Sequence, residues 1–221
     1  MLSMMIGGAV MLEIHLFVNP LGMRCFRCEN DVLRVDQNLN AKISYQFIPM
    51  FNMQTIADTI KLYHLSSCDL RVRKEVADTL SQVILDYKAA LFQGGRRGRQ
   101  YLLRLQNAMV KQGWHYSDQL AHEIAEQSGL DLEMFMEDRH SAIAKEAFKK
   151  DQQMANSLGV TTTATAVVYD SAEPQYGYLM PHFDYETLIE SYRNRTFNPN
   201  QSGKAFAEQY HPQGLQIVKS N

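Results

Sequence analysis

The sequence predicts an α/β protein in which a large all-helical insertion separates a βαβ half from a ββα half. Short apolar and β-branched runs occur near the two ends of the 221-residue chain, whereas the middle carries apolar residues at helical spacing. The composition is that of a globular protein, because 45% of the residues are hydrophobic and 21% are charged. No internal repeat competes with this interpretation.

The βαβ half occupies the first part of the chain. A buried strand expected over Ile14–Val18 stops at Asn19 and Pro20, and the spacing of apolar residues predicts a helix over residues 24–37. A second strand is predicted over residues 43–48. A helix that connects two neighbouring strands in this way makes them parallel.

The middle of the chain is a series of predicted helices. In the strongest of them, apolar residues recur in steps of three and four from Val72 to Leu91, and Gly94 with Gly95 marks the expected helix end. Four further helices are predicted over residues 99–111, 116–127, 132–139 and 141–158.

Strands return after Gly159. Small and β-branched residues predict a strand over 164–169, followed by a strand over 176–180 and a closing helix over 185–193. The tail is polar, contains Gly and Pro, and is expected to be loosely packed. The predicted domains are a sheet domain (12–50 with 159–193), the helical insertion (51–158) and the tail (194–221).

Charge and hydropathy narrow the classes of partner. Twenty-two Lys and Arg residues oppose 24 Asp and Glu residues, so the net charge of −2 creates no global field for nucleic acid or an anionic membrane. No run reaches the roughly 20 apolar residues that span a bilayer. We therefore expect a protein partner or client, and neither nucleic acid nor a membrane.

The apolar start of the chain is similar to a secretory signal peptide but lacks the basic first segment and the cleavage site of one. The first Lys or Arg is Arg24, and Glu13 and His15 interrupt the apolar run. A signal peptide needs a basic start and a cleavage site. We therefore expect a cytoplasmic protein in which residues 1–10 form a loose extension.

Three stretches resemble a known family. They are FVNPLGMRCFRCE (17–29), SGLDLEMFMEDRHSAIAKEAFKKDQQMANSLGV (128–160) and the strand at 163–169. They are similar to the DsbA-like group of the thioredoxin superfamily, in particular to FrnE-type dithiol-disulfide isomerases and Spx-directed adaptors of the ClpXP protease. The resemblance covers about residues 12–193 and implies a thioredoxin-like fold with a helical insertion.

The redox motif of that family is broken in this chain. Alignment of Asn19, Pro20 and Leu21 on the family motif puts the position of the nucleophilic cysteine at Gly22, so only Cys25, at the resolving position, remains. A redox pair needs its first thiol exposed at a helix N-terminus, where the helix dipole stabilises the thiolate. The resemblance therefore specifies the fold more strongly than the activity.

The cis-proline of the family is also missing. Its position falls at Ala164, after Thr163, and no proline occurs from residue 50 to residue 173. A non-proline cis peptide bond costs about 2.5–4 kcal/mol. We therefore expect the bond before Ala164 to be trans.

Cys25 and Cys28 keep the C-x-x-C spacing and leave three interpretations open. They can be buried structural residues, a displaced redox pair helped by neighbouring arginines, or metal ligands. The metal interpretation needs more ligands, and only His64 with Cys68, four residues apart on a possible helix, offers a second pair. We expect no metal and no cofactor.

Charge is unevenly distributed within the insertion. Six basic residues and no acid lie from Lys88 to Lys111, whereas seven acids and no Lys or Arg lie from Asp118 to Asp138. Ion pairs between neighbouring helices explain this pattern. The alternative is a docking surface on the segment GGRRGR, which we expect to be flexible and exposed and whose guanidinium groups bind carboxylates or phosphates.

The expected function is protein binding by a cytoplasmic thioredoxin-fold adaptor of the Spx/ClpXP type. The alternative is a thiol-disulfide oxidoreductase or isomerase that uses Cys25 and Cys28 as catalytic residues. A glutathione-conjugate-handling relative is a third interpretation that no residue favours. The predicted partner-binding residues are Leu21, Gly22, Met23, Arg24, Thr163, Ala164 and Thr165.

Overall fold

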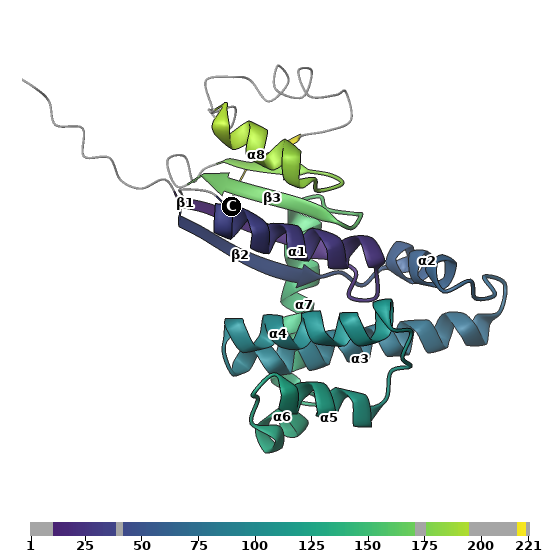
Figure 1. Cartoon of the computed structure of the whole chain (residues 1–221). Coiled ribbons are helices and arrows are strands. Elements are labelled where there is room, and N and C mark those ends of the chain that lie inside the picture. Colours follow the sequence, from purple (N-terminus) through teal and green to yellow (C-terminus); the bar gives the residue numbers. More distant parts are fainter. Residues whose placement is uncertain (1–10, 39–41, 171–175, 195–215, 220–221) are drawn as a thin grey trace, which may run out of the picture. The chain divides into compact units, whose positions relative to one another are not determined.

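The computed structural model describes residues 11–38, 42–170, 176–194 and 216–219, which cluster into two units (Figure 1). The sheet unit contains the described residues of 11–16, 28–46 and 165–219. The helical unit contains residues 17–27 and 47–164. The expected extension at residues 1–10 lies outside the described residues, and the limits given above for the sheet domain and insertion stay a prediction.

A five-stranded sheet forms the centre of the sheet unit, in the order β2-β1-β3-β4-β5 (Figure 1). Strands β3 and β4 pair antiparallel with Val167 opposite Leu179, and β4 pairs antiparallel with β5. Helices α1 and α8 complete the predicted βαβ and ββα halves, which are confirmed. The bounds are β1 (Met11–Val18), α1 (Met23–Asn38), β2 (Lys42–Pro49), β3 (Thr165–Asp170), β4 (Tyr176–Met180), α8 (Tyr185–Arg193) and β5 (Gln216–Lys219).

Strand β5 corrects the prediction for the tail. Residues 195–215 lie outside the described residues, but Gln216–Lys219 add a strand to the sheet, with Val218 opposite Gly177. The edge of β4 presents backbone N–H and C=O groups that an extended segment satisfies. A tail segment can therefore pair with the sheet even though its sequence is mostly polar.

The helical unit follows the predicted series of helices, with one helix that the sequence had not specified, α2. The bounds are α2 (Met53–Leu62), α3 (Leu70–Phe92), α4 (Gly95–Gln106) with a π-helical continuation (Asn107–Lys111), α5 (Asp118–Gln127), α6 (Leu132–Asp138) and α7 (Ala142–Ser157). Five of these helices start at a polar residue whose side chain accepts a backbone N–H of the first turn. These caps are Asn52, Asp69, Ser117, Asp131 and Ser141.

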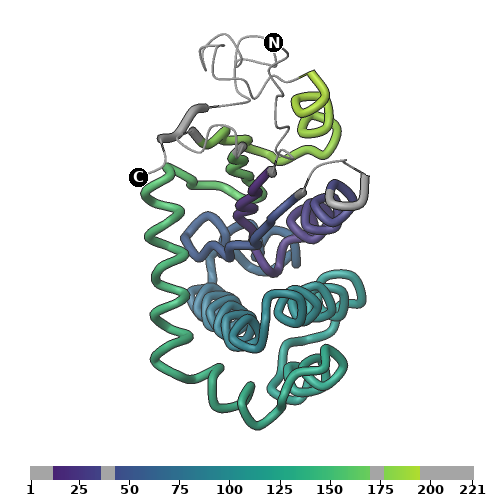
Figure 2. The backbone as a smooth tube through the Cα atoms, turned by 90° about the vertical axis from the view of Figure 1, so that its left-hand side faces the viewer, coloured from purple at the N-terminus to yellow at the C-terminus, as the bar shows by residue number. Residues whose placement is uncertain are grey.

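Helix α3 is the centre of the helical unit. It packs against α2, α4, α6 and α7, and Figure 2 looks along α3 and α4 with α7 running across them. The middle of its apolar stripe, at Leu80, Val83 and Ile84, is completely buried in a core that also contains Tyr101 and Phe135. Burial of such side chains stabilises each by about 1.5–3 kcal/mol relative to exposure. The core of the insertion is therefore built around one long helix.

The segment GGRRGR is not the flexible loop that the sequence predicted. Helix α4 already begins at Gly95, and Gly98 is buried one turn further on. A Cβ on Gly98 would lie 2.7 Å from Leu91 Cδ2 and 2.9 Å from the Leu91 Cα. Glycine at this position allows the backbones of α3 and α4 to approach closely, so packing makes the segment helical. Lys88 pairs with Asp151 of α7 and not with the acidic stretch.

The close approach of α3 and α4 gives a first prediction. Gly98→Ala should lower the free energy of unfolding by about 1–3 kcal/mol, because the new methyl group overlaps Leu91 in a packed core. Equilibrium urea unfolding followed by far-ultraviolet circular dichroism measures the change. Gly95→Ala is the matched control in the same helix, because its Cβ meets only the mobile end of Arg99 at 3.1 Å. Equal stability of the two variants would contradict the prediction.

Candidate functional site

The start of α1 is the place where the family would hold a reactive thiol. Helix α1 begins at Met23, and Gly22 is the residue just before it. The Gly22 carbonyl accepts the N–H of Phe26 at 3.0 Å, and the Gly22 N–H donates to the Asn19 carbonyl at 2.9 Å. Gly22 thus occupies the N-cap position, where the positive end of the helix dipole is strongest.

Cys25 lies in the first turn of the same helix and is buried. Its Sγ accepts a hydrogen bond from the Asn19 backbone N–H at 3.1 Å, and the residue is only 2% exposed. A Cβ built on Gly22 would lie 3.5 Å from this sulfur. The geometry of a helix-terminal dithiol is therefore present, but the outer sulfur is missing.

Asn19 fixes the segment that leads into α1, a role that the sequence analysis missed. Its Nδ2 donates to the Thr59 Oγ1 at 3.0 Å and to the Thr55 carbonyl at 3.3 Å, both in α2. Its Oδ1 accepts the Leu21 N–H at 3.0 Å. The available signal was an Asn before Pro at the end of a strand, since Asn side chains commonly bond the backbone two residues on.

Cys28 is buried in the sheet unit, on the continuation of α1. Its Sγ donates to the Phe183 carbonyl at 3.6 Å. Cys25 and Cys28 are both buried, whereas Cys68 is exposed. Because structural cysteines in apolar surroundings are inert, burial of both sulfurs favours the structural interpretation of the C-x-x-C spacing over the redox one.

The loop before β3 contains a cis peptide bond between Thr163 and Ala164. The expectation of a trans bond is therefore wrong. That expectation considered only the intrinsic preference of a non-proline peptide bond for the trans form. Ala164 is completely buried, so its conformation also depends on tertiary packing. The same loop is tied to the start of α2, because Asn52 Nδ2 donates to the Thr161 carbonyl at 3.2 Å.

The predicted partner-binding residues differ in exposure. Three of them are buried and cannot form an accessible surface: Leu21, Ala164 and Thr165. They follow or begin a strand, where apolar and small side chains fill the core. Four remain accessible: Arg24 is exposed, and Gly22, Met23 and Thr163 are half-buried.

The possible helix that would place His64 and Cys68 one turn apart is not formed. Helix α2 ends at Leu62 and α3 begins at Leu70, so the two residues lie in the connecting turn and not on one helix. Among the residues that the structure describes, no group of three or more His, Cys, Asp or Glu side chains could hold a metal ion. The described helices also include none that is long and apolar enough to cross a membrane.

The fold and the site identify the class of protein. A family model described as thioredoxin matches residues 15–191, and the chain belongs to this family. The order of elements agrees with the DsbA-like group, in which a helical block interrupts the sheet domain, and this confirms the predicted fold class.

Individual relatives carry the comparison further. The ClpXP adapter protein SpxH of Bacillus subtilis (strain 168) is 27% identical over 196 residues, which cover 81% of this chain. The chain spans 66% of the length of that protein. The SpxH protein of Staphylococcus saprophyticus is 23% identical over 186 residues, with 80% of this chain and 64% of that protein covered.

Solved structures agree on the fold. The oxidoreductase DsbA from Xylella fastidiosa superposes with a TM-score of 0.56 at 12% identity, covering 84% of this chain and 87% of that one. The cytosolic disulfide reductase DsbM from Pseudomonas aeruginosa gives a TM-score of 0.54 at 16% identity, covering 83% and 99%. At these identities the likeness concerns the fold alone.

Proposed function

We propose that this chain is a cytoplasmic protein-binding adaptor of the Spx/ClpXP type and not a thiol-disulfide oxidoreductase. The observation that carries the proposal is Gly22 at the N-cap of α1, where a nucleophilic thiol would have to stand. Removal of that thiol leaves the fold intact and abolishes the nucleophile. The names of the SpxH relatives, which are ClpXP adapter proteins, support the proposal.

The accessible part of the site offers a surface for a protein partner. Arg24 and Arg27 are exposed on the first turns of α1, and Thr162 is exposed in the loop before β3. Both segments are bonded to the first two turns of α2, one through Asn19 and the other through Asn52. Arginines on a fixed helix are suited to bidentate contacts with carboxylates of a partner.

Reconstituted proteolysis tests the proposal. We expect the chain to bind the ClpXP client Spx and to accelerate its degradation by ClpXP at physiological salt. The double variant Arg24→Glu/Arg27→Glu should weaken binding of the client by about tenfold or more, because charge reversal in a polar interface costs several kcal/mol. Surface plasmon resonance with immobilised client measures the affinity.

The control is an equal charge reversal of two arginines on another helix. Arg96→Glu/Arg97→Glu changes two exposed arginines at the start of α4 and should leave client binding unchanged. Loss of binding in this variant alone would move the interface to α4. Failure of the unmodified chain to bind Spx or the unfoldase stably, or insulin reduction that disappears in Cys25→Ser, would contradict the adaptor function.

A further inference from the structure

A pocket of about 480 Å³ lies between the end of α2 and the start of α3, far along the chain from the start of α1. Figure 1 shows the turn that joins these two helices. The volume falls in the range of ligand-binding pockets, about 300–1,000 Å³. The lining includes Ile60, Lys61, His64, Leu65, Ser67 and Arg73.

The pocket combines basic and apolar groups. Among its lining residues, Lys61, His64 and Arg73 are basic and none is acidic. The turn also exposes apolar side chains, since Leu65 is 44% and Leu70 is 79% exposed. A single exposed leucine is ordinary, but Leu65 lines the pocket and so places an exposed apolar side chain beside the basic groups.

His64 occupies a backbone conformation that favours glycine. Its φ is 53°, and it follows the C-cap of α2. The His64 N–H donates to the Lys61 carbonyl at 3.3 Å and the Leu65 N–H to the Ile60 carbonyl at 3.0 Å, which together form a Schellman motif. Glycine is the usual residue at this position. His64 therefore provides an imidazole in the lining of the pocket at a position where glycine is usual.

Arg73 fixes the far side of the pocket. Its Nε donates to the Ser67 carbonyl at 2.9 Å, so the turn between the two helices is bonded to the first turn of α3. The pocket is therefore supported by hydrogen bonds on both sides, at the Schellman motif and at Arg73. Preorganised groups bind with a smaller entropic cost than groups that must first be ordered.

We propose that this pocket binds a peptide segment of another protein in which carboxylates stand beside apolar side chains. The carboxylates would pair with Lys61 and His64, and an apolar side chain would pack on Ile60 and Leu65. The choice of partner rests on charge complementarity, because the charged lining residues are all basic. The inference does not rest on the proposed adaptor function, since it concerns a different surface.

Selection from a displayed library of random dodecapeptides on the full chain provides the test. We expect the enriched peptides to be acidic and apolar, and the best one, synthesised with a fluorescent label, to bind more weakly as salt is raised. Fluorescence anisotropy should show a loss of affinity of about tenfold in Lys61→Glu and in His64→Gly, as expected for a lost charged contact.

Two features make the histidine variant informative. Glycine fits the positive φ at residue 64, so His64→Gly should be at least as stable as the unmodified chain and its lost binding cannot come from unfolding. His182→Gly is the matched control, because His182 also has a positive φ, 60°, but lies in the sheet unit. Its peptide affinity should not change.

Several outcomes would overturn the inference. They are the absence of enriched peptides, enrichment of neutral or basic sequences, and undiminished binding by both pocket variants. Binding to phosphatidylglycerol vesicles that needs Lys61, without peptide binding, would assign the pocket to an anionic lipid surface and would also overturn it.

Discussion

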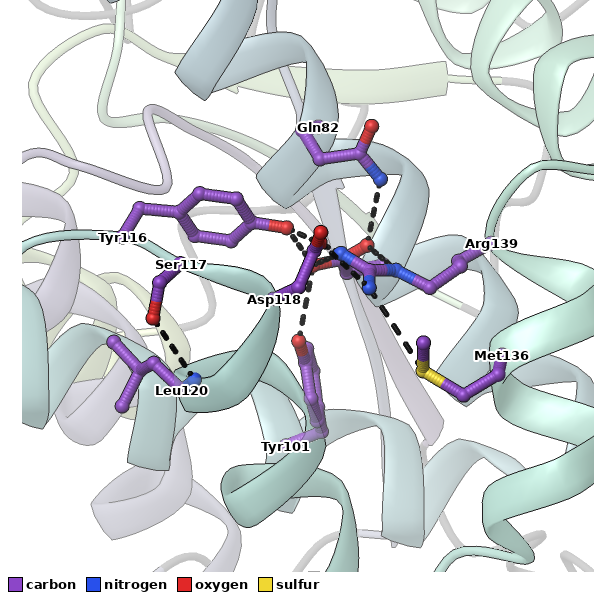
Figure 3. A network of polar contacts seen from close by, with 9 residues as sticks. Gln82, Tyr101, Tyr116, Ser117, Asp118, Leu120, Met136 and Arg139 are labelled. Carbon is purple, nitrogen blue, oxygen red and sulfur yellow. Dashed lines mark hydrogen bonds and ion pairs between the residues drawn. The ribbon is translucent and has the colours of Figure 1, made fainter.

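Replacement of Arg139 by methionine is expected to lower the free energy of unfolding by about 3–5 kcal/mol, because it leaves a buried carboxylate without its charged partner. Arg139 follows α6, and its Nε and Nη2 contact the two carboxylate oxygens of Asp86 in α3 at 2.8 and 3.2 Å (Figure 3). Neither side chain of this pair is exposed to solvent.

Three neutral groups complete the surroundings of Asp86. Gln82 Nε2 donates to it at 2.9 Å, the Tyr101 hydroxyl at 3.2 Å and the Tyr116 hydroxyl at 2.6 Å. Burial, and then the Asp86 charge, raise the pKa of Tyr116 well above its ordinary value. Tyr116 therefore remains a donor at all ordinary pH values. These donors reduce the cost of a buried carboxylate but supply no positive charge.

Urea unfolding of Arg139→Met measures this loss. The control is Arg71→Met, which removes an exposed ion pair with Asp69 and should cause no measurable change. The double variant Arg139→Met/Asp86→Leu should be more stable than the single one, since no buried charge is then left unpaired; Asp118, which also contacts Arg139 at 3.0 Å, is exposed to solvent. A single variant within about 1 kcal/mol of the unmodified chain would show that the ion pair is not needed.

Gly22→Cys is expected to create a thiol-disulfide reductase, whereas the proposed adaptor function predicts no such activity for the unmodified chain. The new Cβ would lie 3.5 Å from Cys25 Sγ, and a disulfide joins two sulfurs at about 2.05 Å, so a small movement closes the bond. Gly22 is half-buried and not in the left-handed region, so a side chain fits its backbone. The helix N-terminus lowers the pKa of a thiol placed there.

Two measurements test whether Gly22→Cys forms a disulfide and reduces a substrate. Mass spectrometry under oxidising conditions should show the loss of two hydrogens, and the insulin reduction assay should show turnover by the variant and none by the unmodified chain. Gly22→Ser is the matched control, because it has the same contacts with Asn19 at 3.2 and 3.3 Å but no sulfur. Failure of the cysteine variant to form a bond with Cys25 would show that a sulfur at position 22 is not enough to restore the redox pair.

The sequence alone predicted most elements of the fold because their signals are local. The steps of three and four residues in α3 and the β-branched run of β3 required no knowledge of tertiary contacts. The importance of Gly22 came from the resemblance to the family motif, whereas the sequence itself indicated that the first strand ends at Asn19 and Pro20 and that a helix follows from about residue 24. These features depend on neighbours within a few residues.

Features that depend on distant contacts were missed or wrongly predicted. The Arg139–Asp86 pair joins residues 53 positions apart, and no local pattern indicates which acid faces which base. The close packing of Gly98 in α4 on Leu91 in α3 is a helix–helix contact that the pattern of apolar residues does not reveal. Burial of Leu21 depends on its place in the core of the helical unit. In each case the tertiary environment decided a conformation or exposure that local propensity left open.

The carboxylate of Asp86 collects hydrogen bonds from α3 itself, from α4, from the segment before α5 and from the residue after α6. Because all four donors bond to the same carboxylate, a substitution at one of them changes the effect of substitutions at the others. Loss of Arg139 leaves a buried charge without its partner, and loss of Tyr101 or Tyr116 removes a hydrogen bond to that charge, so we expect changes at these positions to be accompanied by a change at Asp86. The interior of the insertion should therefore diverge more slowly than the arginine-rich surface of α4, where each side chain can be exchanged separately.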